Sequence, residues 1–101
     1  MPQIQISSAS PFAYEALAVD TLQVLTASKY TSSGAKHIEA LITVETAQFR
    51  YTLDGTTPTN AVGHLVNPGD SIVLQNLDQI KGFQSIKVGA ASAIKVTYFK
   101  R

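Results

Sequence analysis

The sequence predicts an all-β protein, a single-domain antiparallel β-sandwich of jelly-roll-like form with one short helical turn. Three observations lead to this fold class. Short runs alternate between apolar and polar residues, turn-forming residues separate the runs, and the runs recur every ~8–12 residues, as in sandwiches and barrels. With 101 residues, the chain has the size of one domain.

The clearest alternation lies in residues 38–44, where only Leu41 interrupts the polar side. The apolar side of this expected strand consists of Ile38, Ala40, Ile42 and Val44. Shorter runs of the same kind predict further strands at residues 4–6, 22–27, 49–53, 72–74, 86–88 and 94–98. Two sheets built from these strands can each turn one apolar face inward and bury it.

Turn-forming sequences lie between the expected strands. Asp54-Gly55 is a strong hairpin dipeptide, because glycine supplies the positive φ that such a turn needs. Residues 67–70, Asn-Pro-Gly-Asp, predict a second turn, since proline fixes φ and glycine can enter the left-handed region. Residues 89–92 predict a tight hairpin between the last two strands.

One helical turn is expected at residues 77–81. Asn76 is a good N-cap, Gln79 stands at the capping-box position, and Gly82 is a natural stop.

Residues 12–19 fit a helical stripe and an extended segment about equally well. We therefore expect a possible extended N-terminal arm over residues 1–20, followed by a β-sandwich domain over residues 21–101.

The composition limits the classes of partner. Charged residues make up 15% of the chain, against about 25% in a typical soluble domain, and the net charge is +1. A nucleic-acid partner is not expected, because such proteins usually carry a basic patch. No apolar stretch approaches the ~20 residues that span a membrane, so no membrane partner is expected. The N-terminus lacks the charge and apolar run of a signal peptide, and the chain has no cysteine.

Residues with catalytic potential are few. His37 and His64 are the only histidines, and neither has a second ligand at a familiar metal-binding spacing. His37 and Glu39 share a strand face and could hold a metal only if the fold supplied a third ligand. No nucleophile motif or phosphate loop is present, so we expect no enzyme, cofactor or metal. A small jelly-roll enzyme is the least favoured hypothesis.

The most distinctive segment is Phe-Arg-Tyr-Thr-Leu-Asp-Gly-Thr-Thr-Pro-Thr at residues 49–59. It resembles the hairpin of immunoglobulin-like domains attached to chitobiases and other carbohydrate-active enzymes. The resemblance implies a β-sandwich, and it leaves open a carbohydrate- or ligand-binding module as the alternative function. Such a module predicts an exposed aromatic platform beside the loop at residues 54–59, although the chain has no Trp.

The chain from about residue 37 onward resembles small proteins encoded among tailed-phage structural genes. The segments that carry this resemblance are Gln3–Ser7, Ala40–Thr46, Phe49–Thr59, Gly63-His64 with Asn67–Asp70, and Val96–Phe99. The resemblance implies a non-enzymatic virion protein, a capsid decoration or cement protein or a head–tail component. It would be assembled in the host cytoplasm, contact capsid or other virion proteins, and form a homo-oligomer.

Four aromatic residues are the candidate interface. Phe12 and Tyr14 could dock on a neighbouring subunit from the arm, with ordinary core packing as the equal alternative. Tyr98 and Phe99 lie in the last expected strand, which could form a sheet edge that a partner covers.

Overall fold

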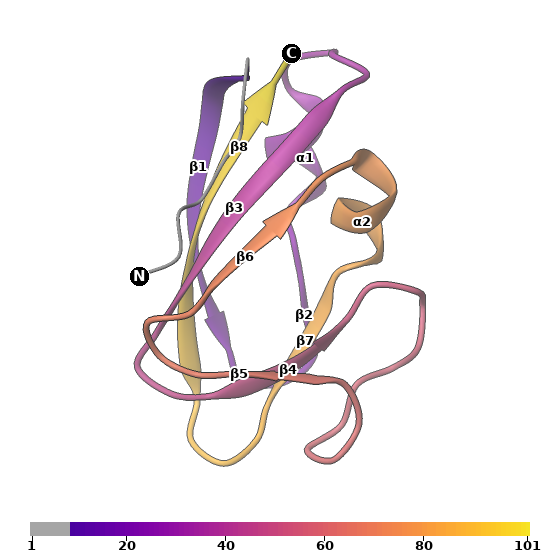
Figure 1. Cartoon of the computed structure of the whole chain (residues 1–101). Helices are drawn as coiled ribbons and strands as arrows, with labels where there is room; N and C mark the ends of the chain where they lie inside the picture. The colour runs from indigo at the N-terminus through magenta and orange to yellow at the C-terminus, as the bar shows by residue number, and fades with distance from the viewer. Residues whose placement is uncertain (1–8) are drawn as a thin grey trace.

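The computed structural model describes residues 9–101 as two four-stranded antiparallel sheets (Figure 1). One sheet, sheet A, has the order β1-β8-β3-β6, and the other, sheet B, has the order β2-β7-β4-β5. The strands are β1 (Ser10–Val19), β2 (Gln23–Val24), β3 (Ile38–Glu45), β4 (Phe49–Thr52), β5 (His64–Val66), β6 (Ser71–Leu74), β7 (Gln84–Lys87) and β8 (Ser92–Lys100). The helices are α1 (Ala27–Thr31) and α2 (Leu77–Gly82).

The pairing pattern is that of a jelly roll. The first strand pairs with the last, β2 with β7, β3 with β6 and β4 with β5, as in one long hairpin wound into two layers. In Figure 1, β4 and β5 run across the direction of β3 and β8. The predicted all-β sandwich is therefore confirmed, because both sheets bury one face in a shared core.

The core follows the period-two pattern. The four apolar residues expected on one side of β3, Ile38 to Val44, are all buried. They belong to the same core cluster as Phe49 on β4 and Phe83 at the end of α2, which are both fully buried. Because successive residues of a strand point to opposite faces, the apolar runs of the sequence place one side of each sheet inside.

The first strand differs from the extended arm expected over residues 1–20. Residues 10–19 form β1, which pairs with β8 from Ser10–Lys100 to Val19–Ser92, with an irregularity between Pro11 and Ala13. Residues 1–8, with the strand expected at 4–6, lie outside the described residues. Residues 10–19 join the sheet because every second side chain from Ala13 to Val19 points toward the core.

One predicted turn is confirmed and another is wrong. Asn67 and Asp70 close the turn at 67–70, where the Asn67 amide donates to the Asp70 carboxylate at 2.8 Å and Gly69 has a φ of 93°. The tight hairpin expected at residues 89–92 does not form, because β7 belongs to sheet B and β8 to sheet A. This segment carries the chain between the layers.

The predicted helical turn is α2. The Asn76 side chain accepts a hydrogen bond from the Gln79 amide at 2.9 Å, as an N-cap does. The Gln79 side chain in turn accepts from the amide of Gln75 at 2.7 Å, one residue before the expected capping-box partner. A second short helix, α1, was not expected from the sequence.

Candidate functional site

Two of the four candidate interface residues lie inside the protein. Tyr98 is fully buried, and its ring centroid lies 6.0 Å from that of Tyr30 and 6.5 Å from that of Phe12. Phe12 packs against the core. The expectation that the last strand forms a sheet edge is wrong, because β8 lies between β1 and β3. An inner strand has both edges paired and buries its inward side chains, so Tyr98 is not a surface for partners.

The other two candidates, Tyr14 and Phe99, point outward from sheet A. Tyr14 is 54% exposed and pairs with Thr97, which in turn pairs with Leu41. Directly opposed residues share a face, and Leu41 is opposed to Val73, so these residues form one row across the outer face of sheet A. Tyr14 remains available for contact.

A buried polar cluster joins β1, β8 and α1. Glu15 is 8% exposed, and its carboxylate accepts hydrogen bonds from the Tyr98 hydroxyl at 2.5 Å and from the Thr26 amide at 3.2 Å. Thr26 is the N-cap residue of α1. Burying a carboxylate is unfavourable unless hydrogen bonds compensate. The cluster therefore ties the start of α1 to sheet A and has the character of a structural support.

Alkaline pH is expected to destabilise the fold through Tyr98. Burial, with the hydrogen bond to Glu15, raises the pKa of Tyr98 well above its usual range. The unfolded chain therefore loses the tyrosine proton near pH ~10, while the folded chain keeps it. The contribution of Tyr98 to the free energy of unfolding is complete below about pH 9 and then falls by up to ~1.4 kcal/mol per pH unit above pH ~10. Urea unfolding at a series of pH values measures this. In the Tyr98→Phe variant the fall should be shallower, and an equal fall would contradict the assignment.

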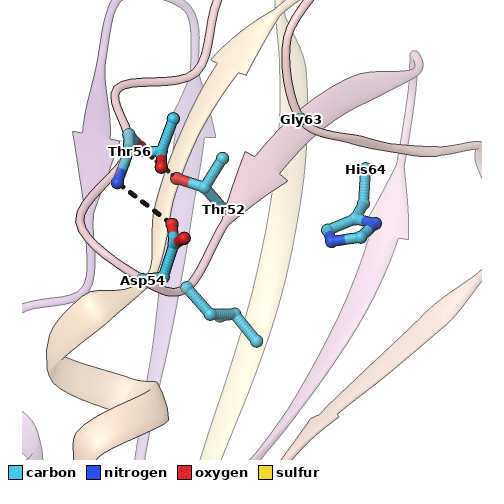
Figure 2. Close-up of a pocket in the computed structure, with 6 residues that line it drawn as sticks. Thr52, Asp54, Thr56, Gly63 and His64 are labelled. Atoms are coloured by element: carbon cyan, nitrogen blue, oxygen red, sulfur yellow. Dashed lines mark hydrogen bonds between the residues drawn. The ribbon is translucent and has the colours of Figure 1, made fainter.

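A polar pocket lies beside the loop between β4 and β5 (Figure 2). Its volume is about 480 Å³, and its lining consists of Thr52, Leu53, Asp54, Thr56, Gly63 and His64. The Asp54 carboxylate accepts a hydrogen bond from the Thr56 amide at 3.1 Å, and the Thr52 hydroxyl donates to the Thr56 carbonyl. Hydrogen bonds from the side chain and the backbone of Thr56, with a smaller contribution from His64, lower the pKa of Asp54. The pocket wall is thus an acceptor-rich turn.

The loop that forms this pocket is longer than the expected hairpin. β4 ends at Thr52 and β5 begins at His64, so Asp54-Gly55 closes a local turn and does not connect the two strands directly. Gly55 has a φ of 91°, as expected of a glycine in such a turn. Pro58 is fully buried and anchors the middle of the loop.

The expected aromatic platform is only partly present. The Tyr51 ring stacks on Phe83 with centroids 5.6 Å apart, and the His64 ring lies 5.4 Å from Tyr51 on another side. Tyr51 is half-buried between them. Burial raises the pKa of its hydroxyl, so this residue stays neutral at physiological pH. The pocket can offer a neutral polar ligand hydrogen-bonding groups, but it has no flat exposed aromatic face.

The two histidines do not converge. His37 lies in a separate pocket of about 90 Å³ with Glu39 and Arg101, whereas His64 lies in the pocket beside the β4–β5 loop. Glu39 is buried and forms an ion pair with Arg101 at 2.7 Å. The Glu39 carboxylate therefore already has a positively charged partner. Within residues 9–101, no three side chains of the metal-binding types come together.

An apolar surface that the sequence patterns did not predict lies on the outer face of sheet B. Five large apolar side chains are strongly exposed in the described part of the chain, and four belong to this sheet or its loops: Leu22 (46%), Val24 (49%), Val62 (44%) and Leu65 (44%). Arg50 on β4 is opposed to Leu65 on β5 and to Ile86 on β7, so these three share the outer face. The short apolar segments at residues 22–24 and 62–66 were the signal available in the sequence.

Comparison with protein-family models, with curated proteins and with solved structures finds no match for this chain. Over residues 9–101, neither helix has the length or the hydropathy needed to span a lipid bilayer.

Proposed function

We propose that this protein is a non-enzymatic structural component of a tailed-phage particle, a capsid decoration or cement protein or a head–tail component. It acts through contacts with capsid or other virion proteins and with copies of itself, after assembly in the host cytoplasm. The resemblance of the sequence to phage structural proteins supports a place in a phage particle. The jelly roll is compatible with it, because this fold is common in viral capsid proteins, although it also occurs in lectins.

The observation that carries the proposal is the outer face of sheet B. Four of the five strongly exposed large apolar side chains of the described residues gather on this sheet and its loops. Single exposed apolar residues are ordinary, but their concentration on one face is typical of a protein–protein contact surface. A chain with only 15% charged residues also suits a surface that is covered in an assembly.

The proposal is tested on the phage that encodes the chain. We expect its gene to lie among capsid and tail genes, and the protein to cosediment with particles purified on a density gradient. A non-structural protein of the same phage serves as the control and should stay at the top of the gradient. A protein that is found only in the free fraction would contradict a role in the particle.

Binding of a neutral carbohydrate is the second candidate function, and the polar pocket beside the β4–β5 loop favours it. Titration of isotope-labelled protein with neutral oligosaccharides should then shift the amide resonances of Thr56 and Gly63. The His64→Ala variant, which removes one wall of the pocket, should weaken the shifts. Resonances that do not move at millimolar sugar would exclude this function.

A further inference from the structure

The outer edge of β1 is the longest strand edge without a partner in the described part of the chain. β1 has ten residues, whereas the other edge strands, β2, β5 and β6, have two, three and four. In Figure 1, β1 forms one margin of sheet A, and no labelled strand lies beyond it. Within residues 9–101, the backbone of β1 pairs with β8 alone. A row of backbone donors and acceptors is therefore left for a further strand.

The features that usually keep strand edges from pairing are confined to the start of β1. Proline, bulges and charged side chains normally serve this purpose. Pro11 and the irregularity in the pairing both lie at the beginning of the strand. From Ala13 to Val19 the pairing with β8 is regular, and the only charged residue is Glu15, whose carboxylate is buried against the Tyr98 hydroxyl. This stretch of the edge is therefore open to pairing.

The hydrogen bonds of sheet A show which residues of β1 direct their backbone groups to this edge. Opposed residues of an antiparallel pair direct their N–H and C=O groups either toward each other or away from each other, and the direction alternates along the strand. The Val44 amide donates to Asp70 and its carbonyl accepts from Gly69, so the backbone of Val44 faces β6.

The same rule carries the direction across the sheet to β1. Because Val44 faces away from β8, the opposed Ile94 faces β1 and forms a hydrogen-bonded pair with Leu17. Leu17 therefore faces β8, and its neighbours Ala16 and Ala18 direct their N–H and C=O groups to the free edge. Both alanines are exposed.

A strand with this arrangement of groups can pair with a copy of itself. We propose that two copies of the chain associate by antiparallel pairing of their β1 edges about a two-fold axis at Leu17. Ala16 of each copy is then opposed to Ala18 of the other, and their N–H and C=O groups form a hydrogen-bonded pair on each side of the axis. The two four-stranded A sheets become one continuous sheet.

The side chains of β1 favour this register. Leu17 packs against the core but is only partly buried, and the axis places it against Leu17 of the second copy, which covers its exposed part. On the outer face, two alanines meet and no bulky side chain obstructs the contact. An axis at Glu15 would instead oppose two carboxylates, whereas this register places Glu15 opposite Val19. The same few residues satisfy both sides of the contact, which assigns the edge to a second copy.

The inference deepens the proposed function, because it names the surface through which copies of the protein contact each other. Cysteine cross-linking tests it, since the chain has no cysteine. Leu17 and its counterpart form a non-hydrogen-bonded pair, in which the side chains of antiparallel strands lie closest. The Leu17→Cys variant should therefore form a disulfide-linked dimer under mild oxidation, visible on a non-reducing gel.

The matched control is Ala13→Cys. Ala13 lies on the same strand and the same face as Leu17 and is also partly buried. In this register it lies about 26 Å along the strands from its counterpart, so the variant should not cross-link. Circular dichroism checks that both variants fold. Equal cross-linking of the two variants, or none in either, would overturn the inference.

Light scattering coupled to size exclusion measures the association without a cross-link. The wild type should reach the mass of a dimer as its concentration rises. Leu17→Lys and Leu17→Glu should each raise the dissociation constant about tenfold or more, because the axis opposes two like charges. An equimolar mixture should recover the dimer, since the lysine of one copy then opposes the glutamate of the other.

Val62→Lys is the control for an added charge, because Val62 is 44% exposed in the loop before β5, on the opposite edge of sheet B from β2, and this variant should stay dimeric. A wild type that is monomeric at every concentration, or a mixture of the two Leu17 variants that stays monomeric, would contradict the pairing. Neither outcome bears on cosedimentation with phage particles, which tests the proposed function separately.

Discussion

Replacement of Gly82 by alanine is expected to destabilise the protein by about 3 kcal/mol. A β-carbon at Gly82 would overlap the carbonyl oxygen of Leu53 and lie 3.0 Å from its carbonyl carbon. Both atoms belong to the backbone at the end of β4, so no side-chain rotation can relieve the contact. In an unconstrained helix, alanine would instead be more favourable than glycine by about 1 kcal/mol. The clash is expected to dominate, because α2 and the β4–β5 loop would have to move apart.

Urea unfolding of the Gly82→Ala variant measures this effect. Gly89→Ala is the matched control, because a β-carbon there meets nothing within 4 Å and Gly89 does not have a positive φ. The control should change the free energy of unfolding by less than about 1 kcal/mol. If the Gly82→Ala variant were as stable as the control, the backbone of α2 could not lie as close to Leu53 as the structure places it.

Replacement of Tyr98 by alanine is expected to cost about 4 kcal/mol. Tyr98 is fully buried, and the substitution removes a ring that contacts Phe12 and Tyr30. It also removes the hydroxyl that donates to Glu15, so a buried carboxylate would lose one of its two hydrogen bonds. The cavity and the lost hydrogen bond both lower the free energy of unfolding.

Tyr98→Phe separates the two contributions. It keeps the ring and removes only the hydroxyl, so a loss of about 1.5–3 kcal/mol is expected for a hydrogen bond to a charged group. Tyr14→Phe is the matched control, because this tyrosine is exposed on the other side of the same sheet, and it should change stability by less than about 0.5 kcal/mol. Equal stability of the Tyr98→Phe protein and the wild type would show that the buried hydrogen bond contributes nothing.

A strand could be predicted from the sequence where one of its faces is buried and the other is exposed to solvent. The alternation in residues 38–44 identified β3 and its buried side, because each step along a strand reverses the side-chain direction. The turn at 67–70 and the cap at Asn76 were also predictable, since they depend on residues that are adjacent in the chain. Interactions between residues close in the sequence were sufficient to predict these elements.

Features that depend on the arrangement of distant strands could not be predicted. Tyr98 was a candidate for an interface, and Phe12 was a candidate for an interface or for the core, because the neighbours of their strands were unknown. The position of β8 between β1 and β3, with the inward direction of its side chain, buries Tyr98. The hairpin expected at residues 89–92 failed for the same reason, since local sequence does not tell which sheet a strand joins. A pocket of about 370 Å³ on sheet B is likewise lined by both Leu22 and Ile86, which lie far apart in the sequence.

The pairing of β1 with β8 also has a consequence for how the chain folds. Ser10 is opposed to Lys100, so sheet A is completed only when segments from nearly opposite ends of the chain meet. Closing so long a loop costs entropy before the contact stabilises the fold, and high contact order slows folding. During synthesis, β1 and β3 are made long before β8, the strand that lies between them. A nascent chain in which β8 has not yet emerged therefore presents unpaired strand edges, and sheet A can be completed only after β8 has left the ribosome.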